Sequence, residues 1–264
     1  MITSIESKLM SNQTAGEHYL MAIDLVQAGN FAASMERICS AIALNPADMN
    51  YRIYKAYVHF MLDEYIESLK VYDECLAANP QMENVWISRN QVAQKCAHTR
   101  SLELGCGIHL KNSMQAAESY GIDIREDLAK NIHKADLSLE RIPFPDNHFD
   151  FVIAEHFIEH VPRLIYAGLH RYAFIELMNE VWRVLKPHGL FYAITPAYPH
   201  AEAFQDPTHV NIITDKTFPA YFCYELPWAH QYGFTGRFNF TKQEWEGPCL
   251  KTWMNKISKR KAQT

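Results

Sequence analysis

The sequence lacks any stretch of about 20 apolar residues, which is the length needed to cross a bilayer. Its N-terminal segment also lacks the apolar core of a secretory signal peptide, so no such peptide is expected. Only 10 glycines and 12 prolines occur in 264 residues, which excludes collagen-like and mucin-like chains. The six cysteines contain no Cys-x-x-Cys pair and are expected to be reduced thiols. These features predict a cytoplasmic location.

A strong excess of positive charge is also missing, because the formal net charge is −5. No binding surface for a long nucleic acid is therefore expected. The C-terminal tail is a local exception, since its last 14 residues contain basic side chains and no acid. Such a tail contacts phosphates or is a solvated terminus, and we favour the second interpretation. The basic residues are Lys251, Lys256, Lys259, Arg260 and Lys261.

An internal repeat of 34 residues is present in the N-terminal third of the chain. The pair Asn45-Pro46 recurs as Asn79-Pro80. Small residues at matching positions allow two antiparallel helices to approach closely, and each proline ends a helix because it cannot continue the hydrogen-bond ladder. The matching pairs are Ala22 with Ala56, Phe31 with Tyr65, and Ser34 with Ser68.

Segments 15–48 and 49–82 resemble tetratricopeptide repeats, and 83–97 is expected to form a helix that closes the stack. Two repeats are fewer than the three or so normally needed for independent stability. We therefore expect residues 1–97 to be a helical domain with a structural or dimerising role. A groove that binds a protein partner is the alternative.

From about residue 98 to 264 the pattern changes to short apolar runs alternating with amphipathic stretches, which is typical of an α/β domain. Helices are expected between the strands, and the clearest covers 172–185. The expected strands cover 101–104, 120–124, 149–154 and 189–195.

A glycine-rich turn follows the first of these strands. Gly105 and Gly107 lack side chains, which allows a sharp turn and the close approach of a ligand. The second strand leads to Asp123, where an acid in a Rossmann-like unit accepts hydrogen bonds from ribose hydroxyls. Neither the full G-x-G-x-x-G fingerprint nor G-x-x-x-x-G-K-[ST] is present, which disfavours a dinucleotide or a nucleoside triphosphate.

Residues 98–264 resemble a class I S-adenosylmethionine-dependent methyltransferase. The resemblance rests on four motifs in order: LELGCG at 102–107, GIDI at 121–124, AD followed by IPFPDNHFDFVI within 135–153, and EVWRVLKPHGLFYAITP at 180–196. It implies a Rossmann-like sheet of seven mostly parallel strands whose last strand is antiparallel. His109 departs from the family pattern, because many members have a third glycine there.

The resemblance also implies which residues bind the S-adenosylmethionine cofactor. Asp123 would hold the ribose. The other cofactor contacts implied are Glu103, Gly105 and Gly107 at the methionine portion, Asp136 and Leu137 at the adenine, and Glu155.

The segment EHFIEHVP, at 155–162, follows the fourth expected strand. If it begins a helix, His156, Glu159 and His160 project from one face, as chelation of one divalent metal ion requires. His209, in a later loop, is a candidate fourth ligand. The pattern is similar to those of two metal-dependent families, the ubiquinone-biosynthesis O-methyltransferases and the small-RNA 3′-terminal 2′-O-methyltransferases. Glu-His-Val after this strand also occurs in metal-free methyltransferases, so a packing role is the alternative.

The sequence thus predicts an O-methyltransferase for a small hydroxylated molecule such as a sugar or secondary metabolite. His160 or His209 would act as general base or as metal ligand. Aromatic residues after 197, among them Tyr221 and Trp228, are expected on the acceptor side or in the core. Two alternatives stay open: 2′-O-methylation of an RNA terminus, and a non-catalytic interaction protein in which the repeats carry the function.

Overall fold

The computed structural model describes residues 13–96, 98–167 and 169–257. Residues 1–12, where a signal peptide would begin, lie outside these ranges. So do the basic residues Lys259, Arg260 and Lys261. The chain divides into two compact units, Met1–Cys96 and Ala97–Thr264. Among the described helices, none combines the length and apolar character needed to cross a bilayer.

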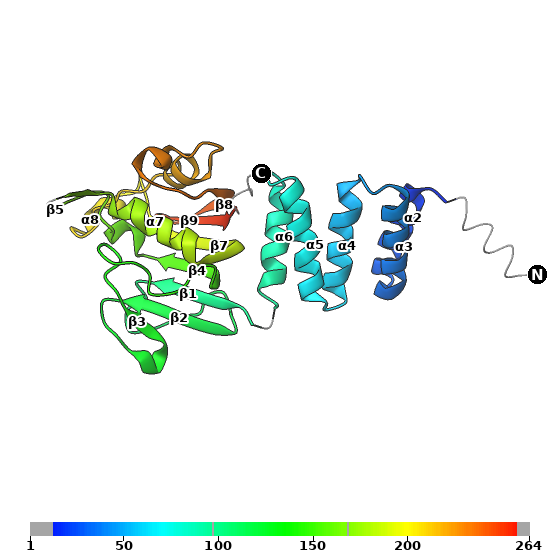
Figure 1. The fold of residues 1–264 in the computed structure, drawn as a ribbon, viewed down its shortest axis with the longest axis horizontal. Coiled ribbons are helices and arrows are strands. Elements are labelled where there is room, and N and C mark those ends of the chain that lie inside the picture. Colours follow the sequence, from blue (N-terminus) through cyan, green and yellow to red (C-terminus); the bar gives the residue numbers. More distant parts are fainter. Residues whose placement is uncertain (1–12, 97, 168, 258–264) are drawn as a thin grey trace, which may run out of the picture. The chain divides into compact units, whose positions relative to one another are not determined.

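The first unit consists of helices, each packed against the next along the chain (Figure 1). The first, third and fifth helices begin 34 residues apart, as do the second and fourth, so the sequence period is also the period of the helices. The helices are α2 (Ala15–Gln27), α3 (Phe31–Leu44), α4 (Met49–Met61), α5 (Tyr65–Ala78) and α6 (Glu83–Ala93).

Two serines show why the repeat carries small residues. Ser34 donates its hydroxyl hydrogen to the carbonyl of Ala22 at 2.8 Å, and Ser68 donates in the same way to Ala56 at 2.7 Å. Both serines are buried, and a short side chain reaches a facing backbone carbonyl only where two helices lie close together. The period is therefore repeated in the hydrogen bonding as well as in the helix positions.

The second unit contains a seven-stranded sheet with the order β3-β2-β1-β4-β7-β9-β8. Strand β9 is antiparallel to both of its neighbours, and the other pairings in the sheet are parallel. This arrangement confirms the predicted fold class. The strands are β1 (Arg100–Leu104), β2 (Glu118–Asp123), β3 (Ile132–Lys134), β4 (Phe149–Glu155), β7 (Leu185–Pro196), β8 (Phe238–Glu246) and β9 (Cys249–Lys256), and a separate hairpin joins β5 (Ile165–Ala167) to β6 (Leu169–Arg171).

The expectation of a helix between each pair of strands is wrong for the first connections. Residues 105–117, between β1 and β2, form an irregular loop, and the connection from β2 to β3 contains only a short 3-10 turn, η1 (Leu128–Lys130). In the first loop the side chain of Asn112 accepts a hydrogen bond from the Ala116 amide and donates one to the Ala116 carbonyl. Side-chain bonds of this kind offer the backbone an alternative to helical pairing.

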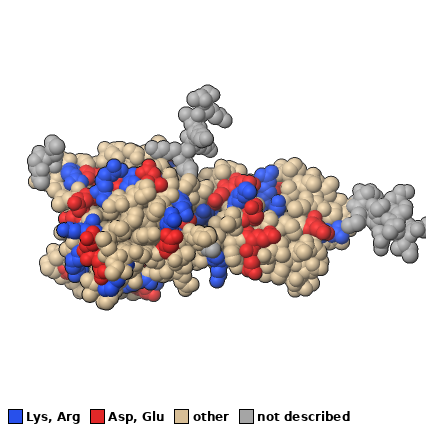
Figure 2. Space-filling model, turned by 60° about the horizontal axis from the view of Figure 1, so that its bottom comes forward, with Lys and Arg blue, Asp and Glu red and all other residues tan. Residues whose placement is uncertain are grey.

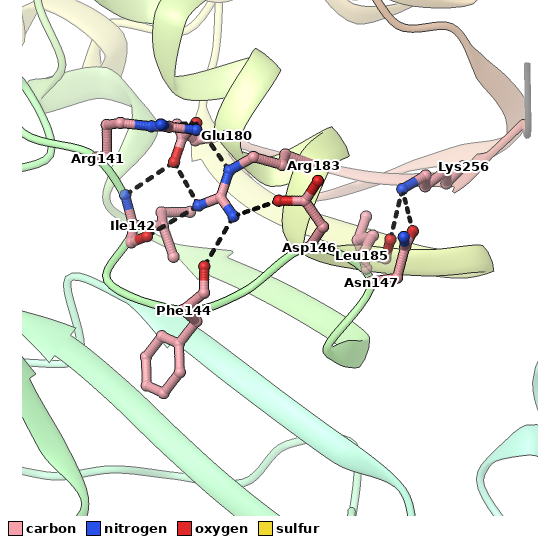
Figure 3. A network of polar contacts seen from close by, with 9 residues as sticks. All are labelled: Arg141, Ile142, Phe144, Asp146, Asn147, Glu180, Arg183, Leu185 and Lys256. Carbon is pink, nitrogen blue, oxygen red and sulfur yellow. Dashed lines mark hydrogen bonds and ion pairs between the residues drawn. The ribbon is translucent and has the colours of Figure 1, made fainter.

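Helix α7 (Ala173–Val184) matches the predicted 172–185 helix and packs its apolar face on the sheet. Arg183, near its end, donates hydrogen bonds to the carbonyls of Ile142 and Phe144 and pairs with Glu180 at 2.7 Å (Figure 3). Burial alone would raise the pKa of Glu180, but hydrogen bonds from Arg183 and Arg141 outweigh it and lower that pKa. The network fixes the loop that leads into β4.

The C-terminal lysines do not form a phosphate-binding tail within the described residues. Lys256 is 4% exposed, donates to the carbonyl of Leu185 and to Asn147, and lies over the ring of Trp182. It is a structural residue of β9 rather than part of a solvated terminus. On the face shown in Figure 2, basic and acidic residues are interspersed.

Candidate functional site

The expected cofactor residues lie at the carboxyl ends of neighbouring parallel strands. Gly105 follows β1, Asp123 ends β2, Asp136 follows β3 and Glu155 ends β4. These four strands are adjacent in the sheet, so their carboxyl ends share one edge. In open α/β sheets, that edge is where ligands bind.

The glycine turn after β1 requires both glycines. Gly105 and Gly107 have φ values of 66° and 63°, in the left-handed region that favours glycine. A Cβ atom on Gly105 would lie 2.3 Å from Cδ2 of Phe157, so no larger residue fits without displacing that ring. The amide of Gly107 donates to Asp123 at 3.1 Å. The turn and the acid at the end of β2 therefore form one connected structure.

The Asp123 carboxylate is 10% exposed and already accepts three hydrogen bonds. Besides the Gly107 amide, the donors are the backbone amide and the Nε atom of Arg125, at 3.1 and 2.8 Å. Burial alone would raise the pKa of Asp123, but these bonds outweigh it and lower that pKa. A carboxylate has about four acceptor positions, which leaves about one for a ligand hydroxyl.

Arg125 was not anticipated from the sequence, although it lies only two residues after Asp123. Its side chain is 63% exposed, so it can turn into solvent and release one acceptor position of the carboxylate. A basic residue this close to a candidate ribose-binding acid was the available signal.

Lys111 is a second residue that sequence reasoning missed. Its backbone amide donates to Glu103 at 2.8 Å, and its Nζ atom pairs with Glu155 at 3.0 Å. Glu155 also accepts a hydrogen bond from the hydroxyl of Ser113. Burial raises the pKa of Glu103, and the bond to Glu155 raises the pKa of Lys111. Both oxygens of Glu155 therefore hold the loop over the strand ends.

The two residues expected at the adenine have different environments. Asp136 accepts a hydrogen bond from the backbone amide of Ser138 at 3.0 Å. Leu137 is buried and belongs to the main hydrophobic core of the unit. The side chain of Leu137 therefore packs mainly against the protein interior.

The segment after β4 is not the helix that would align its histidines on one face. Only a 3-10 turn, η2 (Ile158–His160), forms there, and His156 has a φ of 51°. The amide of His156 donates to the carbonyl of Ile194, which continues the pairing of β4 with β7 by one residue. His156 therefore lies at the end of a strand, and the i, i+3, i+4 argument fails for it.

Three of the four expected metal ligands nevertheless come together. One ligand atom each of Glu159, His160 and His209 lies within 4.8 Å of the others. His156 is outside this group, but its Nδ1 atom forms an ion pair with Glu159 at 3.5 Å, and the carboxylate raises the pKa of His156. Glu159 is 1% exposed, and neither of its oxygens has a hydrogen-bond partner among the described residues.

Backbone hydrogen bonds hold the two loops of this cluster together. The carbonyl of Glu159 accepts from the amides of Val210 and Asn211, at 2.9 and 3.0 Å. The side-chain amide of Asn211 donates to the carbonyl of Ile158 at 3.2 Å. The turn after β4 and the loop after β7 are therefore fixed to each other, although about 50 residues separate them along the chain.

A chain of polar side chains determines the tautomer of neutral His160. Thr208 donates its single hydroxyl proton to Asp206 at 2.6 Å, because an ionised carboxylate only accepts. The contact of 3.0 Å between Thr208 Oγ1 and His160 Nδ1 is then donated by the imidazole. The bonds from Thr208 lower the pKa of Asp206, which keeps the carboxyl ionised. Neutral His160 therefore carries its free lone pair on Nε2.

Two chemistries are open to this cluster. The lone pair on His160 can accept a proton from a ligand hydroxyl. Alternatively, two imidazoles and a carboxylate suit a zinc, manganese, iron, cobalt or nickel ion. In tetrahedral geometry, two atoms bound to one ion at about 2.1 Å are about 3.4 Å apart. Ligand atoms 4.8 Å apart would therefore have to approach each other by roughly 1.4 Å to bind one ion.

Comparisons with known proteins found similarity within the sheet unit. The family model described as "Methyltransferase domain" matches residues 102–193. A probable S-adenosylmethionine-dependent methyltransferase of Mycolicibacterium smegmatis is 27% identical over 139 residues, which cover 43% of this chain and 46% of that protein. A demethylmenaquinone methyltransferase of Listeria welshimeri is 26% identical over 147 residues, 49% of this chain and 54% of the relative. The chain thus spans about half the length of these curated relatives.

A comparison with solved structures also found matches. The crystal structure of an S-adenosylmethionine-dependent methyltransferase from Aquifex aeolicus matches with a TM-score of 0.42 and 16% identity. The match covers 61% of this chain and 84% of the other. Residues 102–193 are therefore similar to methyltransferase domains, among them that of a probable S-adenosylmethionine-dependent enzyme.

Proposed function

We propose that residues 98–264 transfer a methyl group from S-adenosylmethionine to a hydroxyl oxygen of a small molecule such as a sugar or secondary metabolite. The observation that carries this proposal is His160, which follows β4 and has its Nε2 lone pair fixed by Thr208. The methyltransferase-domain match and the glycine turn beside Asp123 support the choice of cofactor. The proposal includes a cytoplasmic location, which rests on the sequence features given above.

When bound, the cofactor supplies an electrophilic methyl group at its sulfonium. Asp123 accepts a ribose hydroxyl, and the glycine turn lets the methionine portion approach the backbone. His160 Nε2 accepts the proton of the acceptor hydroxyl as the carbon–oxygen bond forms and the carbon–sulfur bond breaks. Thr208 and Asp206 hold the imidazole in place and stabilise the positive charge that it acquires. The products are a methyl ether and S-adenosylhomocysteine.

A second candidate is metal-assisted transfer. The buried carboxylate of Glu159 favours it, because its contact with His156 is an ion pair at 3.5 Å and neither oxygen has a hydrogen-bond partner among the described residues. A divalent ion held by Glu159, His160 and His209 would lower the pKa of the acceptor hydroxyl. His160 has one free lone pair, so it cannot be both the base and a ligand. Removal of metal therefore distinguishes the two mechanisms.

The test is release of S-adenosylhomocysteine by the full chain in the presence of hydroxylated acceptors. Sugars, phenols, a demethylated quinone and a short RNA with a free 3′ end are assayed with and without chelator. Activity on small molecules that survives chelation supports the base mechanism, and activity restored by added metal supports the ligand mechanism. Methylation of the RNA alone would overturn the choice of acceptor, and no transfer to any of them would overturn the proposal.

Histidine variants locate the chemistry. His160→Ala is expected to reduce kcat by about 100-fold or more, within the range for a general base. His170→Ala is the matched control, because His170 is an exposed histidine of the same unit outside the cluster. Thr208→Val should reduce the rate less, because it removes the hydrogen bond to His160 but leaves the base. If His160→Ala, Thr208→Val and the control His170→Ala had equal kcat values, His160 would have no role in the mechanism.

For residues 1–97 we propose a tetratricopeptide-like domain that mediates self-association or contact with a protein partner. The 34-residue spacing of the helices and the matched bonds of Ser34 and Ser68 support this. Light scattering of the full chain over a range of concentrations tests self-association. A monomer at every concentration would leave contact with another protein as the remaining role.

A further inference from the structure

A cavity of about 390 Å³ lies beside the N-terminal end of α7. It is formed by segments that follow the turn after β4 and the loop after β7. Its volume is near the lower end of the roughly 300–1,000 Å³ typical of ligand pockets. Its polar lining consists of Arg163, Tyr172, Thr214, Thr217, Tyr221 and Tyr232, and the remaining lining is apolar.

The cavity is built on the same backbone frame as the His160 cluster. Arg163 follows His160 by three residues, and its Nε atom donates to the side-chain oxygen of Asn211 at 2.7 Å. The amide of Asn211 in turn donates to the carbonyl of Glu159 at 3.0 Å. A single residue thus connects the cavity wall to the candidate catalytic turn.

The charge in this cavity has one sign. Arg163 is the charged residue of the lining, and none of the described lining residues carries a carboxyl group. Its described partners are the neutral oxygens of Asn211 and of the Ile212 backbone, which use two of its five N–H groups. The described part of the chain provides no ion pair for Arg163. A ligand carboxylate would supply a charge-assisted bond that the protein does not.

Another part of the lining is aromatic. The rings of Tyr172 and Tyr232 lie 5.2 Å apart at 61°, and those of Tyr221 and Tyr232 lie 6.4 Å apart and nearly parallel. These side chains offer both flat apolar faces and hydroxyl groups. An aromatic ligand gains from such faces through stacking, and the volume is sufficient for at least one substituted ring.

We propose that this cavity holds the methyl acceptor, and that the acceptor is a small hydroxylated aromatic carboxylate. Its carboxylate meets Arg163, and its ring packs on the tyrosines. The inference rests on the proposed methyl transfer for its catalytic meaning. The binding it describes is independent of that reaction.

The test is calorimetric titration of the full chain, without cofactor, with three probes. 4-Hydroxybenzoate has the ring, the hydroxyl and the charge, its methyl ester lacks the charge, and lactate lacks the ring. We expect 4-hydroxybenzoate to bind about 10- to 100-fold more tightly than the ester, as a hydrogen bond to a charged group implies. Lactate should bind more weakly than 4-hydroxybenzoate. An ester that binds as tightly as the acid, or no binding of the acid, would overturn the inference.

Variants of the same chain assign the contact. Arg163→Gln should lose the preference for the acid, whereas Lys216→Gln should keep it. Lys216 is an exposed residue between Thr214 and Thr217 that does not line the cavity. Lys216→Gln therefore removes one positive charge, as Arg163→Gln does, but leaves the cavity wall unaltered. Thermal denaturation checks that Arg163→Gln is folded, and the acid–ester comparison in the unaltered chain does not depend on that variant. An unchanged preference in Arg163→Gln would refute the assignment.

The reaction assay separates this inference from the proposed function. Tight binding of 4-hydroxybenzoate without methyl transfer to any acceptor would preserve the cavity assignment and overturn the proposed function. Methyl transfer to a sugar by a chain that does not bind 4-hydroxybenzoate would preserve the proposed function and overturn the inference.

Discussion

Replacement of Asp123 by alanine tests the cofactor site most directly. In the structure the carboxylate accepts bonds from the Gly107 amide and from Arg125, and about one acceptor position remains for a ribose hydroxyl. The lowered pKa of Asp123 means that this acceptor is charged at neutral pH. Asp123→Ala therefore removes a charged hydrogen-bond acceptor and the partner of the glycine turn.

The expected loss follows from one hydrogen bond to a charged group. Such a bond contributes about 1.5–3 kcal/mol, which corresponds to a roughly 10- to 150-fold weaker Kd for the cofactor. Arg125→Ala should have the opposite effect or none. It removes the Nε donor that competes for Asp123, so a second ribose hydroxyl can be accepted.

The assay is isothermal titration of the full chain with S-adenosylmethionine near pH 7.5. The matched control is Asp127→Ala. Asp127 is an acid four residues further along the chain, and its carboxylate forms an ion pair with Lys130. Thermal denaturation of the apo proteins separates loss of binding from loss of the glycine turn. Unchanged affinity in a folded Asp123→Ala protein, or an equal loss in Asp127→Ala, would refute the placement of the ribose.

Two further predictions concern stability. Arg183→Met should destabilise the protein near pH 7, because Glu180 loses one of the two arginines that lower its pKa. A carboxyl with a depressed pKa stabilises the fold above its ordinary value of 4.5 and loses this effect as the pH falls through the folded value, so the difference in Tm from the unaltered chain should shrink below pH 4.5. Gly105→Ala should lower Tm by more than the left-handed φ of 66° alone explains, because the new Cβ collides with Phe157.

Controls for these two predictions are available in the chain. Gly247→Ala places a Cβ at a similar φ of 58° with nothing within 4 Å, so it pays only the conformational cost of about 1–2 kcal/mol. Equal losses for Gly105→Ala and Gly247→Ala would argue against the collision. For the pH series, a Tm difference that stays constant from pH 7 down to about pH 3 would show that Arg183 acts through contacts other than its ion pair with Glu180.

Local patterns predicted most of the sheet. The expected strands at 101–104, 120–124, 149–154 and 189–195 correspond to β1, β2, β4 and β7, and their boundaries shift by no more than four residues. Helix α7 was equally clear, because its apolar residues recur at the helical period and pack on the sheet. These elements were predictable since each buries an apolar run whose spacing is visible in the sequence.

The expected helices between the first strands failed for a local reason that the apolar pattern did not reveal. Asn112 bonds to both backbone groups of Ala116, and the loop has positive φ at Asn112 and Gln115. The aligned histidines after β4 failed because the amide of His156 pairs with Ile194. Whether a backbone group pairs within its own segment or with a neighbouring strand depends on tertiary structure. The spacing of apolar residues contains no information on this pairing.

The 34-residue helical period, the strands and the glycines before Asp123 are readable from the sequence, because these features depend on side-chain size and polarity at short spacings. Which polar groups meet depends on how distant segments pack together. His160 and Thr208 are 48 residues apart, and they touch because the amides of Val210 and Asn211 bind the Glu159 carbonyl. The two loops are neighbours because β4 and β7, which they follow, are paired in the sheet.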